Sequence, residues 1–148
     1  MTRLFKLGII SFIVFFVLLL LMSLLVPSTI RISRAINIES PKSVIFPHLA
    51  DTARWREWNE IDVTNIDITV RHADSGIIRT NWHYKGRDIQ SSFRLEESAG
   101  ITVVQWYFDF RLRWYPWEKF GSITLDKQFG IPMERSLENL QKVITKTP

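Results

Sequence analysis

Residues that could carry out chemistry are few in this chain, and their spacing favours structural roles. The sequence contains no cysteine, so a thiol nucleophile, a cysteine metal site and a disulfide are excluded. Its three histidines, His48, His72 and His83, do not fall at the spacings that metal ligands require. His72 precedes Asp74 in a segment of turn composition, which favours a solvated turn over a metal site.

Nucleophilic, phosphate-binding and acid–base motifs are not found in the sequence either. There is no Gly-x-Ser-x-Gly motif, and the six glycines are too scattered for a phosphate-binding loop. His83 and Asp109 fall at outward-facing positions of alternating segments, where they are poor candidates for catalysis inside a pocket. We therefore expect no catalytic residue, no metal and no cofactor. An enzyme is the weaker alternative.

One segment is long and apolar enough to cross a membrane. Residues 7–26 carry no charge, and a helix of about 20 residues covers about 30 Å, the thickness of a bilayer's hydrocarbon core. A secretory signal has a shorter apolar region and small residues at its cleavage site, whereas Leu24, Leu25 and Val26 are large. We therefore predict an uncleaved transmembrane anchor over residues 1–27, followed by one domain over residues 28–148.

The basic residues around this segment only weakly define its orientation. Arg3 and Lys6 precede it, and Arg31, Arg34 and Lys42 follow it closely. Because a short N-terminal tail is easily retained, we expect a single-pass protein of the inner or cytoplasmic membrane with its C-terminal domain outside the cytoplasm. The formal net charge of +4 is too small to indicate a nucleic-acid partner.

Alternation of apolar and polar residues predicts five strands behind the anchor. The turns between the later strands are short, which predicts antiparallel neighbours. Proline after Ser40 predicts a helix capped by Ser40 and ending near Asp51, and a second short helix is expected up to Trp58. The predicted strands cover residues 30–39, 65–71, 76–84, 91–97 and 101–113.

The chain ends in a predicted amphipathic helix, which begins after Gly130 and carries an apolar face. Residues 115–129 are ambiguous between helix and strand. A sheet with one apolar face must be covered, and this helix is the only element long enough to do so. We therefore predict an α+β fold in which a curved antiparallel sheet surrounds a long C-terminal helix. The apolar face of that helix consists of Met133, Leu137, Leu140 and Ile144.

Four segments stand in a characteristic order along the chain: Ile36–Phe46, Leu49–Trp58, Gly100–Trp106 and Gly130–Lys142. Together they resemble the SRPBCC (START-like, polyketide cyclase-like) superfamily. The resemblance implies the helix-grip fold, with a hydrophobic pocket between sheet and helix, in a membrane-anchored bacterial type of member. Proteins of the superfamily bind lipids, sterols, polyketides and other apolar molecules, and some are cyclases or hydrolases. Only 48 positions separate Trp58 from Trp106, fewer than the family pattern, which implies a smaller or more open pocket.

The alternating aromatic residues of the strands, facing the C-terminal helix, form either a plain core or the lining of a pocket. Burial of an apolar ligand there contributes roughly 25 cal/mol per Å². We predict a pocket for a small apolar ligand or lipid, without catalysis; the alternative is a tethered interaction domain whose cavity is filled by its own side chains. The protein partner is unknown. The predicted lining residues are Trp82, Tyr84, Phe93, Val104, Trp106, Phe108, Met133 and Leu137.

Basic and aromatic residues are interleaved between Arg111 and Phe120. Tryptophan and tyrosine favour the headgroup zone of a bilayer, and arginine favours anionic headgroups. Trp114, Tyr115 and Trp117 are therefore candidates for a lid that touches the membrane interface. The alternative is a connection whose two tryptophans cap the core.

Overall fold

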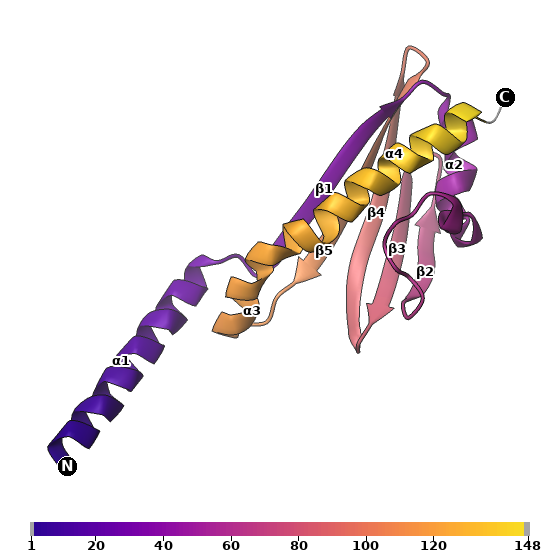
Figure 1. Ribbon diagram of the computed structural model, residues 1–148. Coiled ribbons are helices and arrows are strands. Elements are labelled where there is room, and N and C mark those ends of the chain that lie inside the picture. The colour runs from indigo at the N-terminus through magenta and orange to yellow at the C-terminus, as the bar shows by residue number, and fades with distance from the viewer. Residues whose placement is uncertain (1, 147–148) are drawn as a thin grey trace. The chain divides into compact units, whose positions relative to one another are not determined.

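The computed structural model describes residues 2–146 (Figure 1). The chain forms two compact units, each built from segments distant in sequence. The first comprises Met1–Ile30 and Arg111–Thr124, and the second comprises Arg31–Phe110 and Leu125–Pro148. Arg111–Thr124, called the aromatic segment below, therefore packs with the N-terminal helix.

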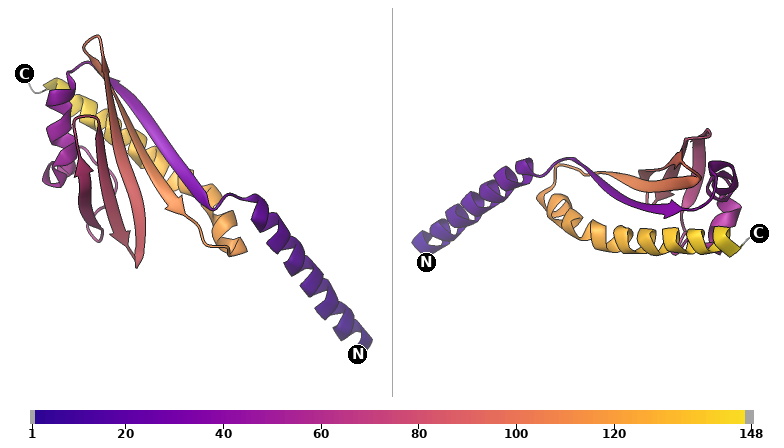
Figure 2. Two further views of the ribbon diagram at one scale, coloured as in Figure 1. Left: turned by 180° about the vertical axis from the view of Figure 1, so that it is seen from behind. Right: turned by 90° about the horizontal axis from the view of Figure 1, so that it is seen from above.

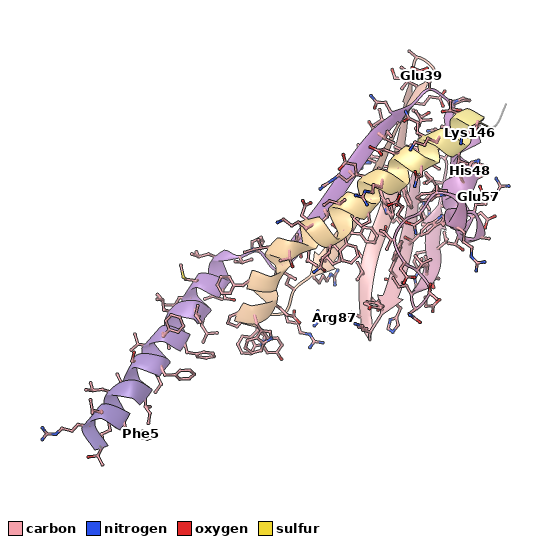
Figure 3. All side chains as sticks on the ribbon, in the orientation of Figure 1. Phe5, Glu39, His48, Glu57, Arg87 and Lys146 are labelled. Atoms are coloured by element: carbon pink, nitrogen blue, oxygen red, sulfur yellow. The ribbon has the colours of Figure 1, made fainter. Side chains whose placement is uncertain are left out.

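The first unit contains helix α1 (Thr2–Leu25), the short helix α3 (Pro116–Gly121) and a 3₁₀ turn, η2 (Ser122–Thr124). The predicted apolar helix is confirmed, and it begins several residues before the apolar run. Its side chains project outward all round the axis, from Phe5 near one end onward (Figure 3). α3 contacts α1, and Leu112 N donates to Ser28 O at 2.8 Å, which joins the two chain segments of the unit.

The second unit is built on a curved, five-stranded antiparallel sheet in the order β1-β5-β4-β3-β2. Side chains alternate between two faces of the sheet, and the apolar face of β5 is buried at every second residue from Thr102 to Phe110. A register shift between Val70 and His72 interrupts the pairing of β2 with β3. The strands are β1 (Thr29–Ile38), β2 (Asp67–Ala73), β3 (Ile77–Tyr84), β4 (Arg87–Ser98) and β5 (Ile101–Arg111).

Helix α4 (Ile131–Lys146) lies along one face of this sheet (Figure 2, right). Met133, Leu137, Leu140 and Ile144 are all buried, as the helical spacing predicted. The predicted α+β architecture is confirmed, with a curved antiparallel sheet and a long C-terminal helix.

Two shorter elements precede β2 and close one end of the sheet. They are α2 (Lys42–Ala50) and the 3₁₀ helix η1 (Thr52–Glu57). The prediction that Ser40 caps the first of them was wrong: the N-cap residue is Pro41, and no side chain caps the helix. Ser40 O instead accepts a hydrogen bond from Thr102 Oγ1 at 2.7 Å, so this part of the chain is held by β5.

The ambiguous segment, residues 115–129, is helical throughout most of its length. α3 and η2 belong to the first unit, and a π-helical turn, η3 (Asp126–Gly130), leads into α4 in the second. A strand over residues 122–125, the alternative from the sequence, does not form. The guanidinium group of Arg34, whose Nη2 pairs with Asp126 Oδ1 at 2.9 Å, lies against Gly130 at the end of η3, so a larger residue there would displace this ion pair.

Candidate ligand-binding site

The predicted lining residues come together, but most of them form a packed aromatic core. All except Tyr84 are buried, with exposed fractions of 0–1%. The rings of Phe93 and Trp106 stack at 5.0 Å, and Phe108 lies 5.3 Å from Trp106 and 4.9 Å from Trp82 between ring centroids. Contacts of this kind are worth about 0.5–1.5 kcal/mol each beyond the area that they bury.

Two tryptophans that the sequence analysis did not assign to the site fill the centre of this core. Trp55, from η1, lies 5.6 Å from Trp82 and 5.7 Å from Phe93, and Trp58 lies 5.9 Å from Trp106. Their indole N–H groups donate to the backbone oxygens of α2 residues, which fixes the rings in place. The only signal in the sequence was the Trp-x-x-Trp spacing within the resemblance, and that spacing does not reveal that both rings point between sheet and helix.

The polar groups inside the core satisfy one another. Trp82 Nε1 donates to Thr80 Oγ1 at 3.0 Å, and Thr80 Oγ1 donates to Ser91 O at 3.2 Å. Trp106 Nε1 donates to Ser91 Oγ at 2.8 Å. The hydroxyl groups of Thr80 and Ser91 thus accept hydrogen bonds from the two indole N–H groups, so they are poor candidates to orient a ligand at the centre of the unit.

An open pocket of about 350 Å³ lies beside this core, at the end of the sheet where β3 turns into β4. It includes two of the eight predicted residues, Trp82 and Tyr84. The other six do not line it, and their contact with a ligand stays a prediction. The full lining consists of Ile61, Asp62, Asn65, Ile66, Trp82, Tyr84, Ile89, Gln128 and Phe129.

The sheet provides one wall of the pocket. Trp82 and Ile89 are paired residues of β3 and β4, so both side chains stand on the same face of the sheet. Tyr84 follows two residues after Trp82 on that face and is 37% exposed. Phe129, on η3, is held by ring contacts of 5.6 Å to Phe108 and 4.9 Å to Phe110. This wall is therefore carried by two paired strands and by a ring already packed against the core.

The loop from Asn59 to Ile66 provides the opposite wall, and helix α4 positions it. Ser136 Oγ accepts a hydrogen bond from Glu60 N at 2.8 Å, and Asn139 Nδ2 donates to Glu60 Oε1 at 3.1 Å. Ser136 is fully buried although it is polar, because this bond uses its hydroxyl group. The polar residues of the helix thus hold the loop over the sheet end.

Asp62 is the carboxylate of the pocket lining, and its charge is stabilised locally. Its Oδ1 accepts hydrogen bonds from Thr64 Oγ1 at 2.6 Å and from Thr64 N at 3.0 Å. These bonds, the hydroxyl one first, lower the pKa of Asp62 below its usual value. The group is ionised at neutral pH, so its oxygen atoms can only accept hydrogen bonds.

A second hollow, of about 690 Å³, lies at the C-terminal end of α4, and its character differs. Figure 3 labels two of its residues, Glu39 and Lys146, near that end of the helix. Its lining is mostly polar or charged and includes Gln141, whose Nε2 donates to Asn37 O at 2.9 Å. We therefore regard the pocket beside Trp82 as the candidate site for an apolar ligand.

Two of the three histidines, and the acidic residues discussed with them, lie in exposed pairs, whereas His48 is half-buried on α2 and its Nδ1 has no hydrogen-bond partner. His72 Nε2 lies 3.0 Å from Asp74 Oδ2, in the predicted turn. His83 Nδ1 lies 2.8 Å from Asp88 Oδ1. Asp109 faces outward and forms a two-bond contact with Arg31 at 2.7 and 2.8 Å. None of these pairs lines the pocket beside Trp82.

The three residues predicted for a lid or membrane interface lie in the first unit. Trp114 and Trp117 are each 65% exposed, and Tyr115 stacks on Trp117 with ring centroids 4.9 Å apart. The alternative, in which both tryptophans cap a core, does not agree with this exposure. Their contact with a membrane stays a prediction.

The arrangement of sheet and C-terminal helix gives the second unit a helix-grip fold, and solved structures share this arrangement. CalU16 from Micromonospora echinospora matches with a TM-score of 0.58 and 16% identity, covering 81% of this chain and 76% of its own. MLL2253 from Mesorhizobium loti matches with a TM-score of 0.59 and 13% identity, covering 81% and 98%.

DynU16, a protein of the dynemicin biosynthetic locus, matches with a TM-score of 0.50 and 16% identity over 73% of this chain and 47% of its own. No protein-family model matches the sequence, and no curated protein sequence is significantly similar to it. At these identities the structural similarity establishes the fold and leaves the function to the site.

Proposed function

We propose that this chain is a membrane-tethered member of the SRPBCC superfamily that binds a small, mainly apolar molecule in the pocket beside Trp82, without catalysis. The observation that carries the proposal is the pocket itself: about 350 Å³, with a wall of aromatic and aliphatic side chains and one ionised carboxylate. Ligand sites in proteins have this composition and volumes of about 300–1,000 Å³.

The size of the pocket limits the ligand. At about 30 Å³ for each water-sized unit, the pocket holds about a dozen non-hydrogen atoms. A ligand of that size, gaining about 0.3 kcal/mol or more per atom, binds with a dissociation constant in the millimolar to micromolar range. A whole phospholipid is too large, so the ligand is a small molecule or one end of a longer one.

We propose a binding role for Asp62 and not a role in proton transfer. A carboxyl group whose pKa is lowered is ionised at neutral pH, so it has no proton to donate, and it is a weak base. The group is suited instead to accept a hydrogen bond from the polar end of the ligand. DynU16, which comes from a biosynthetic locus, is the reason to consider an enzyme, but no histidine and no second carboxyl group line the pocket among the described residues.

The tether is proposed from the composition and exposure of α1. The most apolar 18-residue window of α1 (Thr2–Leu25) has a mean hydropathy of 2.9, and only 6% of that window is buried within the chain. A core helix of a soluble protein would be mostly buried. A signal sequence is also exposed. However, Ser23 and Val26, at the end of the apolar helix, are hydrogen bonded to Trp114 and Lys119 of the aromatic segment, and cleavage after them would remove these bonds.

Native mass spectrometry of the full chain released from detergent tests the ligand. The wild-type protein should carry a small-molecule adduct, or bind 1-naphthol as a probe. Ile89→Trp narrows the pocket and should abolish the adduct, whereas Val103→Trp, at a 37% exposed position on β5 outside the pocket lining, should retain it. A wild-type protein that carries no adduct and takes up no probe would refute the proposal.

A further inference from the structure

The aromatic segment is attached to the C-terminal end of α1 by hydrogen bonds from both sides. Ser23, in the last turns of α1, donates from Oγ to Trp114 O at 3.3 Å. Lys119, on α3, donates from Nζ to Val26 O at 2.8 Å. Lys119 is only 4% exposed although it carries a charge, because its ammonium group is used at the end of α1.

The contact covers one face of α1 near its end. Ser23 is buried, and Leu19, Leu20 and Val26 are partly covered, while the rest of the helix is exposed. These positions recur at helical spacing and therefore form one stripe. From Leu19 to Val26 the helix rises about 10 Å, so the aromatic segment lies beside the last 10 Å of the apolar helix.

The outer surface of the aromatic segment is apolar, and the described residues of the first unit leave it uncovered. Trp114 and Trp117 are each 65% exposed, and Ile123 is 76% exposed. Such side chains on a soluble surface would be exposed to water at a cost. Arg111 and Arg113 are exposed at the start of the same segment, and with Lys119 they outnumber its one acidic residue, Glu118.

We propose that the aromatic segment is an interfacial wedge that inserts into the headgroup zone of the same bilayer that α1 spans. Since Val26 ends the apolar run, a segment beside Leu19–Val26 lies within about 10 Å of the membrane surface, the depth at which interfacial helices are buried. Tryptophan favours that zone, and the two arginines complement anionic headgroups. This inference rests on the proposed tether and adds a second, independently testable membrane contact.

The depth of the aromatic segment in the bilayer can be measured with labels on single introduced cysteines. Because the natural chain contains no cysteine, each label then has one attachment site. The full chain would carry Ile123→Cys, Trp117→Cys or Val14→Cys, labelled with a nitroxide in phosphatidylcholine–phosphatidylglycerol vesicles. Val14 is 62% exposed in the middle of α1 and reports the tether. The accessibility of each label to oxygen and to a water-soluble nickel chelate gives its depth, calibrated with spin-labelled lipids.

We expect the label at Val14 to lie near the bilayer centre and the labels at positions 117 and 123 to lie about 5–10 Å below the phosphates. A deep label at Val14 with water-exposed labels at 117 and 123 would overturn the wedge and leave the tether standing. A water-exposed label at Val14 would overturn both. Labels at 117 and 123 shielded from oxygen and chelate alike would show that protein covers the segment, which also overturns the wedge.

Discussion

The bond from Lys119 to the end of α1 allows a quantitative test of how the aromatic segment is held. Substituting Lys119→Met keeps most of the buried side-chain stem and removes the ammonium group that lies 2.8 Å from Val26 O. A hydrogen bond that involves a charged group contributes about 1.5–3 kcal/mol. Losing it should raise the population of the open segment about 10- to 100-fold, since 1.4 kcal/mol is a factor of ten.

Hydrogen exchange of the full chain in lipid nanodiscs measures this opening. The amides of Glu118 and Lys119, which both donate to Tyr115 O, should exchange about 10- to 100-fold faster in Lys119→Met. Amides of β4 are the internal reference and should keep their rates. Lys127→Met, at an exposed lysine, is the matched control and should leave α3 unchanged.

An unchanged exchange rate in α3 would show that the bond from Lys119 to Val26 contributes nothing to holding the aromatic segment against α1. Faster exchange in β4 as well as α3 would also count against this role of the bond, since the effect would then be global. Ser23→Ala removes the weaker, neutral bond to Trp114 O and should accelerate exchange less, in line with about 0.5–1.5 kcal/mol.

Three further predictions concern the second unit. Ser91→Ala leaves the buried Trp106 indole N–H without its 2.8 Å acceptor and should lower the free energy of unfolding by about 1–3 kcal/mol in urea titration; no change would contradict the hydrogen bond. Leu140→Ala, at a fully buried position of α4, should cost about 2–5 kcal/mol by the same measurement, and a cost below 1 kcal/mol would mean that α4 does not pack there. The backbone N–H of Gly76, then His72 and the N–H of Ile77, lower the pKa of Asp74 to about 2. The ionised carboxylate therefore stabilises the fold above the unfolded-state pKa of about 4, and this stabilisation is lost as the pH falls through about 2. The free energy of unfolding of Asp74→Asn should approach that of wild type as the pH falls from 5 to 2. A difference that stays constant over this range would contradict the prediction.

The elements of this fold could be predicted from the sequence because their signals are local. The apolar run before Pro27, the alternation in β5 and the spacing from Met133 to Ile144 each express one periodicity within one element. Residues 115–129 were ambiguous because their stabilisation is not local. The segment is divided between the two compact units, and its short helices are stabilised by residues outside it.

The candidate site was only partly predictable. Alternation correctly placed Trp82 and Tyr84 on the face that borders the pocket, but it could not show that Trp55 and Trp58 would enter the space in front of Phe93 and Trp106. Whether a face lines a cavity or a packed core depends on which side chains from other elements arrive there. The loop wall of the pocket likewise depends on bonds from α4, such as Ser136 to Glu60.

The apolar helix, the strands and the amphipathic helix follow from local sequence patterns, since hydrophobic period and turn composition act within a few residues. Only the tertiary structure decided that the pocket lies at the sheet end and that Lys119 holds the end of α1. Those features arise between residues far apart in the chain, 93 positions in the case of Lys119 and Val26. Proximity of that kind is created by packing, and no local pattern records it.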